Sequence, residues 1–194
     1  SGASGASWNI GTETNLTFTP GTSTLQFTGG IATAAFRSTQ LGTLTYNNVT
    51  YTGLGEWQIG SGSGDNPTVN VFTIGPGVTL VFDDGDTLTV SSFVTSGTSS
   101  TQGAVLRVGT GSPTFNISDA SGSNTLNWLQ VSGVTFGGGA SWTCFACFNG
   151  GNNSGISFTG FGTGGGCILG GWLLWRDMPE HINDNFPAWI EKAG

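Results

Sequence analysis

The sequence predicts a mainly β protein whose body is a parallel β-helix, or solenoid, and three observations support this fold class. First, short segments that alternate apolar and polar residues follow one another through most of the chain, as expected of strands with one buried face. Second, glycine accounts for 35 of the 194 residues and charged residues for only 8%, while the abundant Thr, Val and Phe suit a pleated sheet. Third, similar phrases return along the chain at comparable intervals.

The alternating segments begin near residue 15 and are bounded by Gly, Pro, Asn or Asp, which favour turns. Expected strands before residue 85 include Leu16–Phe18, Leu25–Phe27, Leu44–Tyr46, Val49–Tyr51, Val69–Val71 and Leu80–Phe82. Later ones are Leu88–Val90, Val105–Val108, Phe115–Ile117 and Leu126–Trp128. No segment before about Leu169 has a helical period.

The internal repeat favours the β-helix over other β architectures. The phrases LTYNNV, VNVFTI, LTVSSF, VLRVGT and LNWLQV begin at residues 44, 69, 88, 105 and 126. One turn of a β-helix has about this length, and each turn stacks on the previous one. An antiparallel β-sandwich or jelly roll would show the same short strands and is the alternative.

Three regions follow from this pattern: a flexible lead-in over 1–14, the β body over 15–168, and a helical C-terminal segment over 169–194. In the last region apolar residues recur at helical spacing, with Asp177 as a plausible N-cap. Six of them form a predicted docking surface for a partner subunit: Trp172, Trp175, Ile182, Phe186, Trp189 and Ile190. The other interpretation is a cap over the open end of the solenoid, which would otherwise polymerise through its edges.

Charge excludes several classes of partner. The formal net charge is −7, and the four basic residues, Arg37, Arg107, Arg176 and Lys192, are scattered along the chain. Nucleic acid and anionic lipid both require a basic surface, so neither is expected to bind. Membrane insertion is not expected either, because the longest apolar run, Ile168 to Trp175, is too short to span a bilayer.

The cysteines and the single histidine form a weak candidate zinc set: Cys144, Cys147, Cys167 and His181. Their spacing matches no recognised zinc pattern, because only the first pair forms a C-x2-C knuckle. One disulfide that involves Cys167, or three buried thiols, is the favoured interpretation. We therefore expect neither a metal nor another cofactor.

The acidic residues do not predict a catalytic site. Asp83, Asp84 and Asp86 could offer oxygen ligands to Ca²⁺, but the EF-hand pattern is missing and a solvated turn is favoured. Glycoside hydrolysis requires two facing carboxyl groups, and no motif identifies such a pair. The sequence also has no nucleophile elbow, so the protein is expected not to be an enzyme, with a glycan-cleaving spike as the enzymatic alternative.

Four phrases between Gly77 and Phe158 carry a resemblance to a known group of proteins. They are GVTLVFDDGDTLTVSSFVTSGT, AVLRVGTGSPTFNISDASG, LNWLQVSGVTFGGGASW and FNGGNNSGISF. Their order resembles a segment of β-repeat structural proteins from tailed-bacteriophage virions and of related bacterial surface proteins. Matching positions include Gly85, Thr87, Val90, Phe93, Gly97 and Thr98, then Trp128, Leu129, Trp142 and residues 150–155. Cys144, Phe145 and Cys147 depart from that pattern, as does the Trp-rich C-terminus.

The resemblance implies a structural role on a virion surface, as a tail-fibre, spike or capsid-decoration subunit. The expected partners are further copies of the chain, with a trimer favoured, another virion or surface protein, and host glycans in host attachment. A subunit of a cellular extracellular filament, joined by strand exchange through residues 7–19, is one alternative. A glycan-binding module with exposed Trp57 and Trp142 is another. In each case the protein is expected to be extracellular or on the virion surface.

Overall fold

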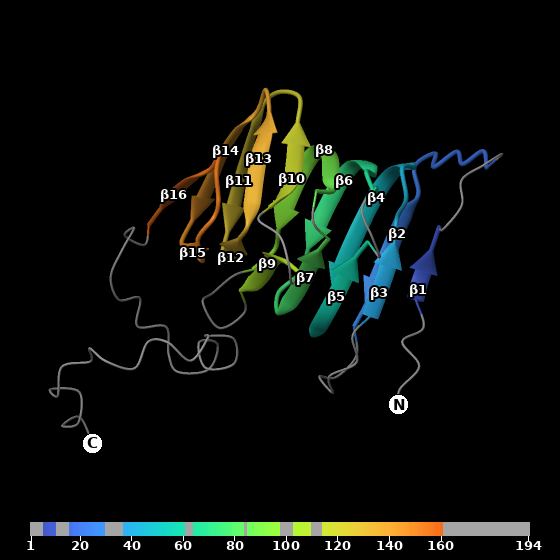
Figure 1. Ribbon diagram of the computed structural model, residues 1–194, viewed down its shortest axis with the longest axis horizontal. Coiled ribbons are helices and arrows are strands. Elements are labelled where there is room, and N and C mark those ends of the chain that lie inside the picture. The colour runs from blue at the N-terminus through green and yellow to red at the C-terminus, as the bar shows by residue number, and fades with distance from the viewer. Residues whose placement is uncertain are drawn as a thin grey trace, which may run out of the picture.

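The protein is a β-solenoid built from three parallel sheets (Figure 1). The computed structural model describes residues 6–10, 16–29, 37–60, 64–83, 85–97, 103–109 and 114–160. All strand pairs in these residues are parallel. This pairing confirms the predicted β-helix and excludes the antiparallel jelly roll.

Sheet A has seven strands, and the chain returns to it once in every rung of the solenoid. In spatial order its strands are β1 (Ala6–Asn9), β3 (Arg37–Gln40), β5 (Gly55–Ile59), β7 (Val78–Phe82), β9 (Ala104–Val108), β12 (Leu129–Ser132) and β15 (Phe148–Asn149).

Sheets B and C complete each rung. Sheet B contains, in sequence order, β2 (Thr24–Thr28), β4 (Thr45–Thr52), β6 (Thr68–Ile74), β8 (Thr87–Thr95), β10 (Phe115–Asp119) and β13 (Val134–Gly138). Sheet C contains β11 (Ser123–Asn127), β14 (Ser141–Phe145) and β16 (Ser157–Thr159). The early rungs therefore alternate between sheets A and B, whereas the later ones pass through A, B and C.

The rungs differ in length, which explains why the repeat in the sequence is imperfect. Residues that face each other on neighbouring rungs are separated by 24, 23, 21 and 29 residues in the first rungs and by 19 in the last. The phrases that begin at 44, 69 and 88 lie in successive strands of sheet B. The phrase at 105 lies in sheet A, and the phrase at 126 crosses from sheet C to sheet A.

The third sheet arises because the long strand β8 lies beside two shorter strands of the next rung, β10 and β11. Thr87–Val90 pair with Asn116–Asp119 of β10. The later part of β8 contacts β11 instead: the Phe93 amide donates to Asn124 Oδ1 (3.0 Å), and the Asn127 amide donates to Thr95 Oγ1 (2.8 Å). A corner between β10 and β11 therefore divides one bent sheet into sheets B and C.

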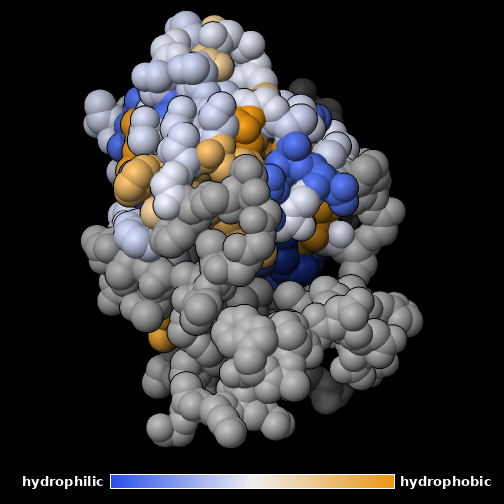
Figure 2. Space-filling model, turned by 90° about the vertical axis from the view of Figure 1, so that its left-hand side faces the viewer, coloured by the Kyte–Doolittle hydropathy of each residue, from blue (hydrophilic) through white to orange (hydrophobic). Residues whose placement is uncertain are grey.

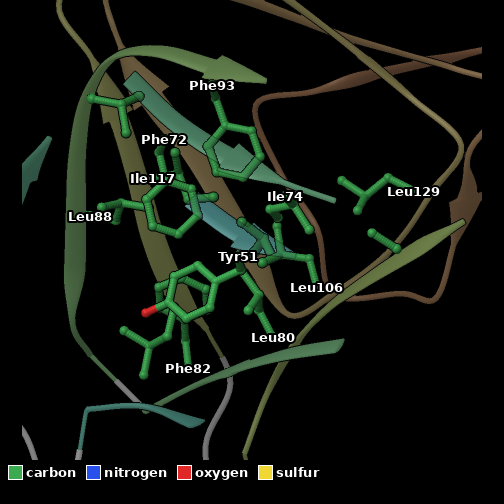
Figure 3. Packing of buried hydrophobic residues seen from close by; sticks show 14 of the residues in the cluster. Tyr51, Phe72, Ile74, Leu80, Phe82, Leu88, Phe93, Leu106, Ile117 and Leu129 are labelled. Carbon is green, nitrogen blue, oxygen red and sulfur yellow. The ribbon is translucent and has the colours of Figure 1, made fainter. Parts of the chain in front are cut away.

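The core lies inside the rungs and is rich in stacked aromatic rings (Figure 3). Phe72 stacks on Phe93 with ring centroids 5.3 Å apart, and Phe27 stacks on Tyr51 at 4.7 Å. Identical or similar residues at equivalent positions of successive rungs therefore contact one another along the solenoid axis. Ten of the sixteen aromatic residues in the described part of the chain are buried in this core.

Several expected elements differ from the observed ones. Leu16–Phe18 is not a strand, and Leu44–Tyr46 and Val49–Tyr51 belong largely to the single strand β4. Within the expected flexible lead-in, Ala6–Asn9 forms β1, which pairs with β3 of the same chain. The predicted helical segment over 169–194 lies outside the described residues.

Candidate functional site

Three aspartates from two successive turns converge at one point between sheets A and B. A Cβ atom placed on Gly60 would lie 3.0 Å from Asp86 Oδ2, 3.3 Å from Asp83 Oδ2 and 3.4 Å from Asp65 Oδ2. Gly60 has a φ of +92°, which favours glycine, and the missing side chain leaves room for the carboxyl groups. We call Asp65, Asp83 and Asp86 the aspartate cluster.

The aspartate cluster is enclosed by the chain. Asp65 and Asp86 are only 7% and 3% exposed. Asp83 Oδ1 accepts a hydrogen bond from Gln58 Nε2 (2.9 Å), and Asp86 Oδ1 accepts one from the Gly64 amide (2.8 Å). Burial of Asp86 corrects the expectation of a solvated turn at this residue, whereas Asp83 is half-buried. Asp65 and Asp86 have little access to a substrate.

Burial raises the pKa of Asp86 from 3.8 to about 6. The Gly64 amide opposes this shift by stabilising the carboxylate, while the negative charges of Asp65 and Asp83 add to it. Perturbed carboxyl groups are common in active sites, but structural clusters also produce them. Because this cluster is enclosed, we interpret it as a structural feature.

We expect folding stability to fall as pH rises from about 4 to about 6. In this range the unfolded chain has already released the Asp86 proton while the folded protein retains it, so the folded state binds more protons. Asp86→Asn stays neutral and should flatten the profile, and it should be more stable than wild type at pH 7 by about 1–2 kcal/mol. Chemical denaturation from pH 4 to pH 8 measures both effects.

The matched control for this experiment is Glu56→Gln, which removes one carboxylate away from the aspartate cluster. Glu56 Oε2 lies 3.0 Å from an Arg107 guanidinium nitrogen in an ion pair on the outer face of sheet A. This variant leaves the aspartate cluster intact and should retain the fall in stability that Asp86 causes between pH 4 and pH 6. Parallel profiles for wild type and Asp86→Asn would show that Asp86 does not cause the slope.

The described residues do not form either of the weak candidate metal sites, for calcium or for zinc. In this part of the chain, no group of three or more His, Cys, Asp or Glu side chains is arranged to hold a metal ion. Asp84 of the calcium candidate lies outside the described residues, as do Cys167 and His181 of the zinc candidate. The sequence analysis did not identify Asp65 as a member of this cluster. The one feature of the sequence that could have indicated it is that Asp65 precedes Asp86 by about the length of one rung.

Cys144 and Cys147 form a disulfide between the end of β14 and the following turn. Their Cα atoms are 5.6 Å apart, and both residues are buried. The sequence analysis favoured either one disulfide that involves Cys167 or three buried thiols. This interpretation is wrong for Cys144 and Cys147, which pair with each other. As disulfide sulfurs, these two atoms do not act as thiolate ligands.

The aromatic residues of the expected glycan module are buried. Trp57 is 2% exposed and Trp142 is 4% exposed, and the Trp142 ring packs against Phe93 and Phe136. Trp142 Nε1 donates to the Gly137 carbonyl oxygen (3.2 Å). These two side chains belong to the core and cannot stack on a sugar.

The expected docking residues all lie outside the described part of the chain. They are Trp172, Trp175, Ile182, Phe186, Trp189 and Ile190. The described part of the chain ends at Gly160, which follows β16. Close to this point Phe145 is 51% exposed, and a Cβ on Gly160 would lie 3.0 Å from its ring. An apolar side chain is therefore exposed at the end of the described part of the chain.

These features define a parallel β-solenoid with an enclosed aspartate cluster, a disulfide and an aromatic core. No protein-family model, curated protein or solved structure matches the chain. In the described residues no helix is long and apolar enough to cross a membrane.

Proposed function

We propose that the protein is a non-enzymatic structural subunit of a virion surface, of the fibre, spike or capsid-decoration type found in tailed phages. The observation that carries this proposal is the solenoid itself. Stacked parallel rungs with a continuous aromatic core make a stiff body whose length grows with the number of rungs, which suits a projecting or spacing element. The four phrases that resemble virion proteins lie on these rungs.

Two further features support a role outside the cytosol. The Cys144–Cys147 disulfide fits an oxidising environment, because disulfides persist mainly in extracellular and surface proteins. The outer positions of the strands carry mostly uncharged Thr, Ser, Asn and Gln side chains. A cellular extracellular filament would share both features, and it is the second candidate.

The C-terminal segment is the proposed point of assembly. Figure 2 views the solenoid from the end where β16 lies, and hydrophobic residues are exposed there among hydrophilic ones. Ile156 and Phe158 are only partly buried at this end of the core. The Trp-rich segment that follows would dock onto another copy, or onto another surface protein, with its aromatic residues as anchors.

Light scattering on the purified full-length chain tests this assembly. We expect a stable oligomer, a trimer or larger, and we expect Trp175→Ala/Trp189→Ala to reduce it to the monomer, because each lost anchor costs about 2 kcal/mol or more. Trp8→Ala, at the opposite end of the chain, is the control and should leave the oligomer intact. A folded wild-type monomer would contradict the proposal and assign the segment to capping of its own solenoid.

A further inference from the structure

The outer face of sheet B carries an ordered array of hydroxyl and amide groups. In β8 the buried Leu88 lies between the outward-facing Thr87 and Thr89. The next rungs repeat this arrangement with Asn116, Ile117 and Ser118 in β10, and with Thr135, Phe136 and Gly137 in β13. Alternation along each strand therefore points a pair of polar side chains outward on β8 and on β10, and Thr135 alone on β13, where Gly137 has no side chain.

The strand register aligns these side chains in two columns. One column contains Thr45, Thr68, Thr89 and Ser118. The other contains Thr87, Asn116, Thr135 and Ser154. We call these eight residues the hydroxyl face.

Parallel pairing sets the spacing of the hydroxyl face. Neighbouring strands in a sheet are about 4.8 Å apart, and alternate residues along one strand are about 6.6 Å apart. Side chains in a column also bond to each other: Asn116 Nδ2 donates to Thr87 Oγ1 (3.4 Å), and Ser154 Oγ lies 3.2 Å from Thr135 Oγ1. Such bonds restrict the rotamers and keep the array regular.

The hydroxyl face is also free of ionised groups. In the described strands of sheets B and C the only charged residue is Asp119, which is 5% exposed. The ionic residues of the described strands otherwise lie in sheet A, where Arg107 and Glu56 pair. An ionic ligand would therefore find no complementary charge on the hydroxyl face.

We infer that the hydroxyl face binds ice. Aligned hydroxyl and methyl groups, which threonine supplies at five of the eight positions, can hold water molecules in positions close to those of the oxygen lattice at a crystal surface. An uncharged face suits this ligand, because ionised groups would hold water in an incompatible arrangement. A planar polysaccharide fits less well, since sugar faces stack on exposed aromatic rings and the columns of the hydroxyl face contain none.

The test measures ice recrystallisation and thermal hysteresis with the purified full-length protein at micromolar concentration. Wild type should slow recrystallisation and shape the crystals. Thr89→Tyr places a bulky ring in the middle of the first column. Tyrosine is common in β-strands, so the substitution should not disrupt the fold. This variant should require at least about tenfold more protein for the same effect, equivalent to about 1.4 kcal/mol of binding free energy.

Thr79→Tyr is the matched control, since Thr79 faces outward from β7 in sheet A and is similarly half-buried. It should retain the wild-type effect on ice. Circular dichroism establishes that each variant is folded. Wild type that leaves ice growth unchanged would overturn the inference, as would equal losses in the two variants. Adsorption to crystalline cellulose or chitin without any effect on ice would also overturn it and assign the face to a polysaccharide.

Discussion

Phe72→Ala is expected to destabilise the solenoid by about 3–5 kcal/mol, the usual cost of removing a buried aromatic side chain. Phe72 is fully buried in the middle of the aromatic ladder, between Phe93 on the next rung and Tyr51 on the previous one. Truncation removes both ring contacts and opens a cavity that the rigid rungs cannot close easily. Urea denaturation followed by tryptophan fluorescence measures the change in the free energy of unfolding.

Two variants of β6 make this prediction specific. Phe72→Leu retains most of the apolar volume and should cost about 1–2 kcal/mol. Thr73→Ala changes the outward-facing neighbour and should stay within about 0.5 kcal/mol of wild type. If Phe72→Ala were no more harmful than Thr73→Ala, the aromatic ladder would not be the main source of stability.

Many of the strands were predictable because the chain alternates apolar and polar residues where a strand lies flat. Leu88 and Val90 are separated by one polar residue, and both are buried as the alternation requires. Stacking of rungs was also predictable, since equivalent apolar residues return after roughly 20 residues. Most of the expected strands accordingly lie in sheets A and B, whereas Leu16–Phe18 alternates equally and forms no strand.

The corners of the solenoid were harder to predict, because they interrupt the alternation. Tyr46 and Val49 are both buried although three positions apart, and so are Val69 and Phe72. At this spacing the strand must bend for both side chains to face inward. We therefore expected two strands where the chain forms the one bent strand β4.

The corner between sheets C and A follows the same rule. Leu126 and Leu129 are both buried, and Trp128 between them has a φ of +52°. A strand was expected to continue through Trp128, whereas the chain turns there from β11 into β12. Three-residue spacing of buried residues is thus the signal that marks a corner.

The aspartate cluster and the disulfide depend on contacts that a single sequence does not specify. Asp65 and Asp86 are brought together only by the stacking of successive rungs, so their proximity requires the register. Cys144 and Cys147 are separated by two residues, but their pairing requires the turn at Ala146, whose φ is +54°. Neither the register nor this turn is encoded in a short motif.

The corner between β10 and β11 contains a buried polar network. Asp119 occupies an inward-facing position that Val90 fills on the previous rung. Asp119 Oδ2 accepts a hydrogen bond from Asn124 Nδ2 (2.8 Å), and Asn124 Oδ1 accepts one from the Phe93 amide (3.0 Å). Both side chains are about 95% buried, so Asn124 joins the corner to the preceding rung without contact with bulk water.

Asn124→Ala is therefore expected to cost about 2–4 kcal/mol, because it leaves a carboxylate oxygen and a backbone amide buried without these partners. Urea denaturation measures the loss, and hydrogen exchange should show that protection falls first at the amides of β11 and the end of β8. Asn127→Ala, on the outward side of the same strand, is the matched control and should change stability by less than about 0.5 kcal/mol. A cycle with Asp119→Ala should show coupling of about 1–3 kcal/mol between the two side chains. Additive effects would mean that the corner is held by the surrounding hydrophobic packing, and that the division into sheets B and C does not depend on this network.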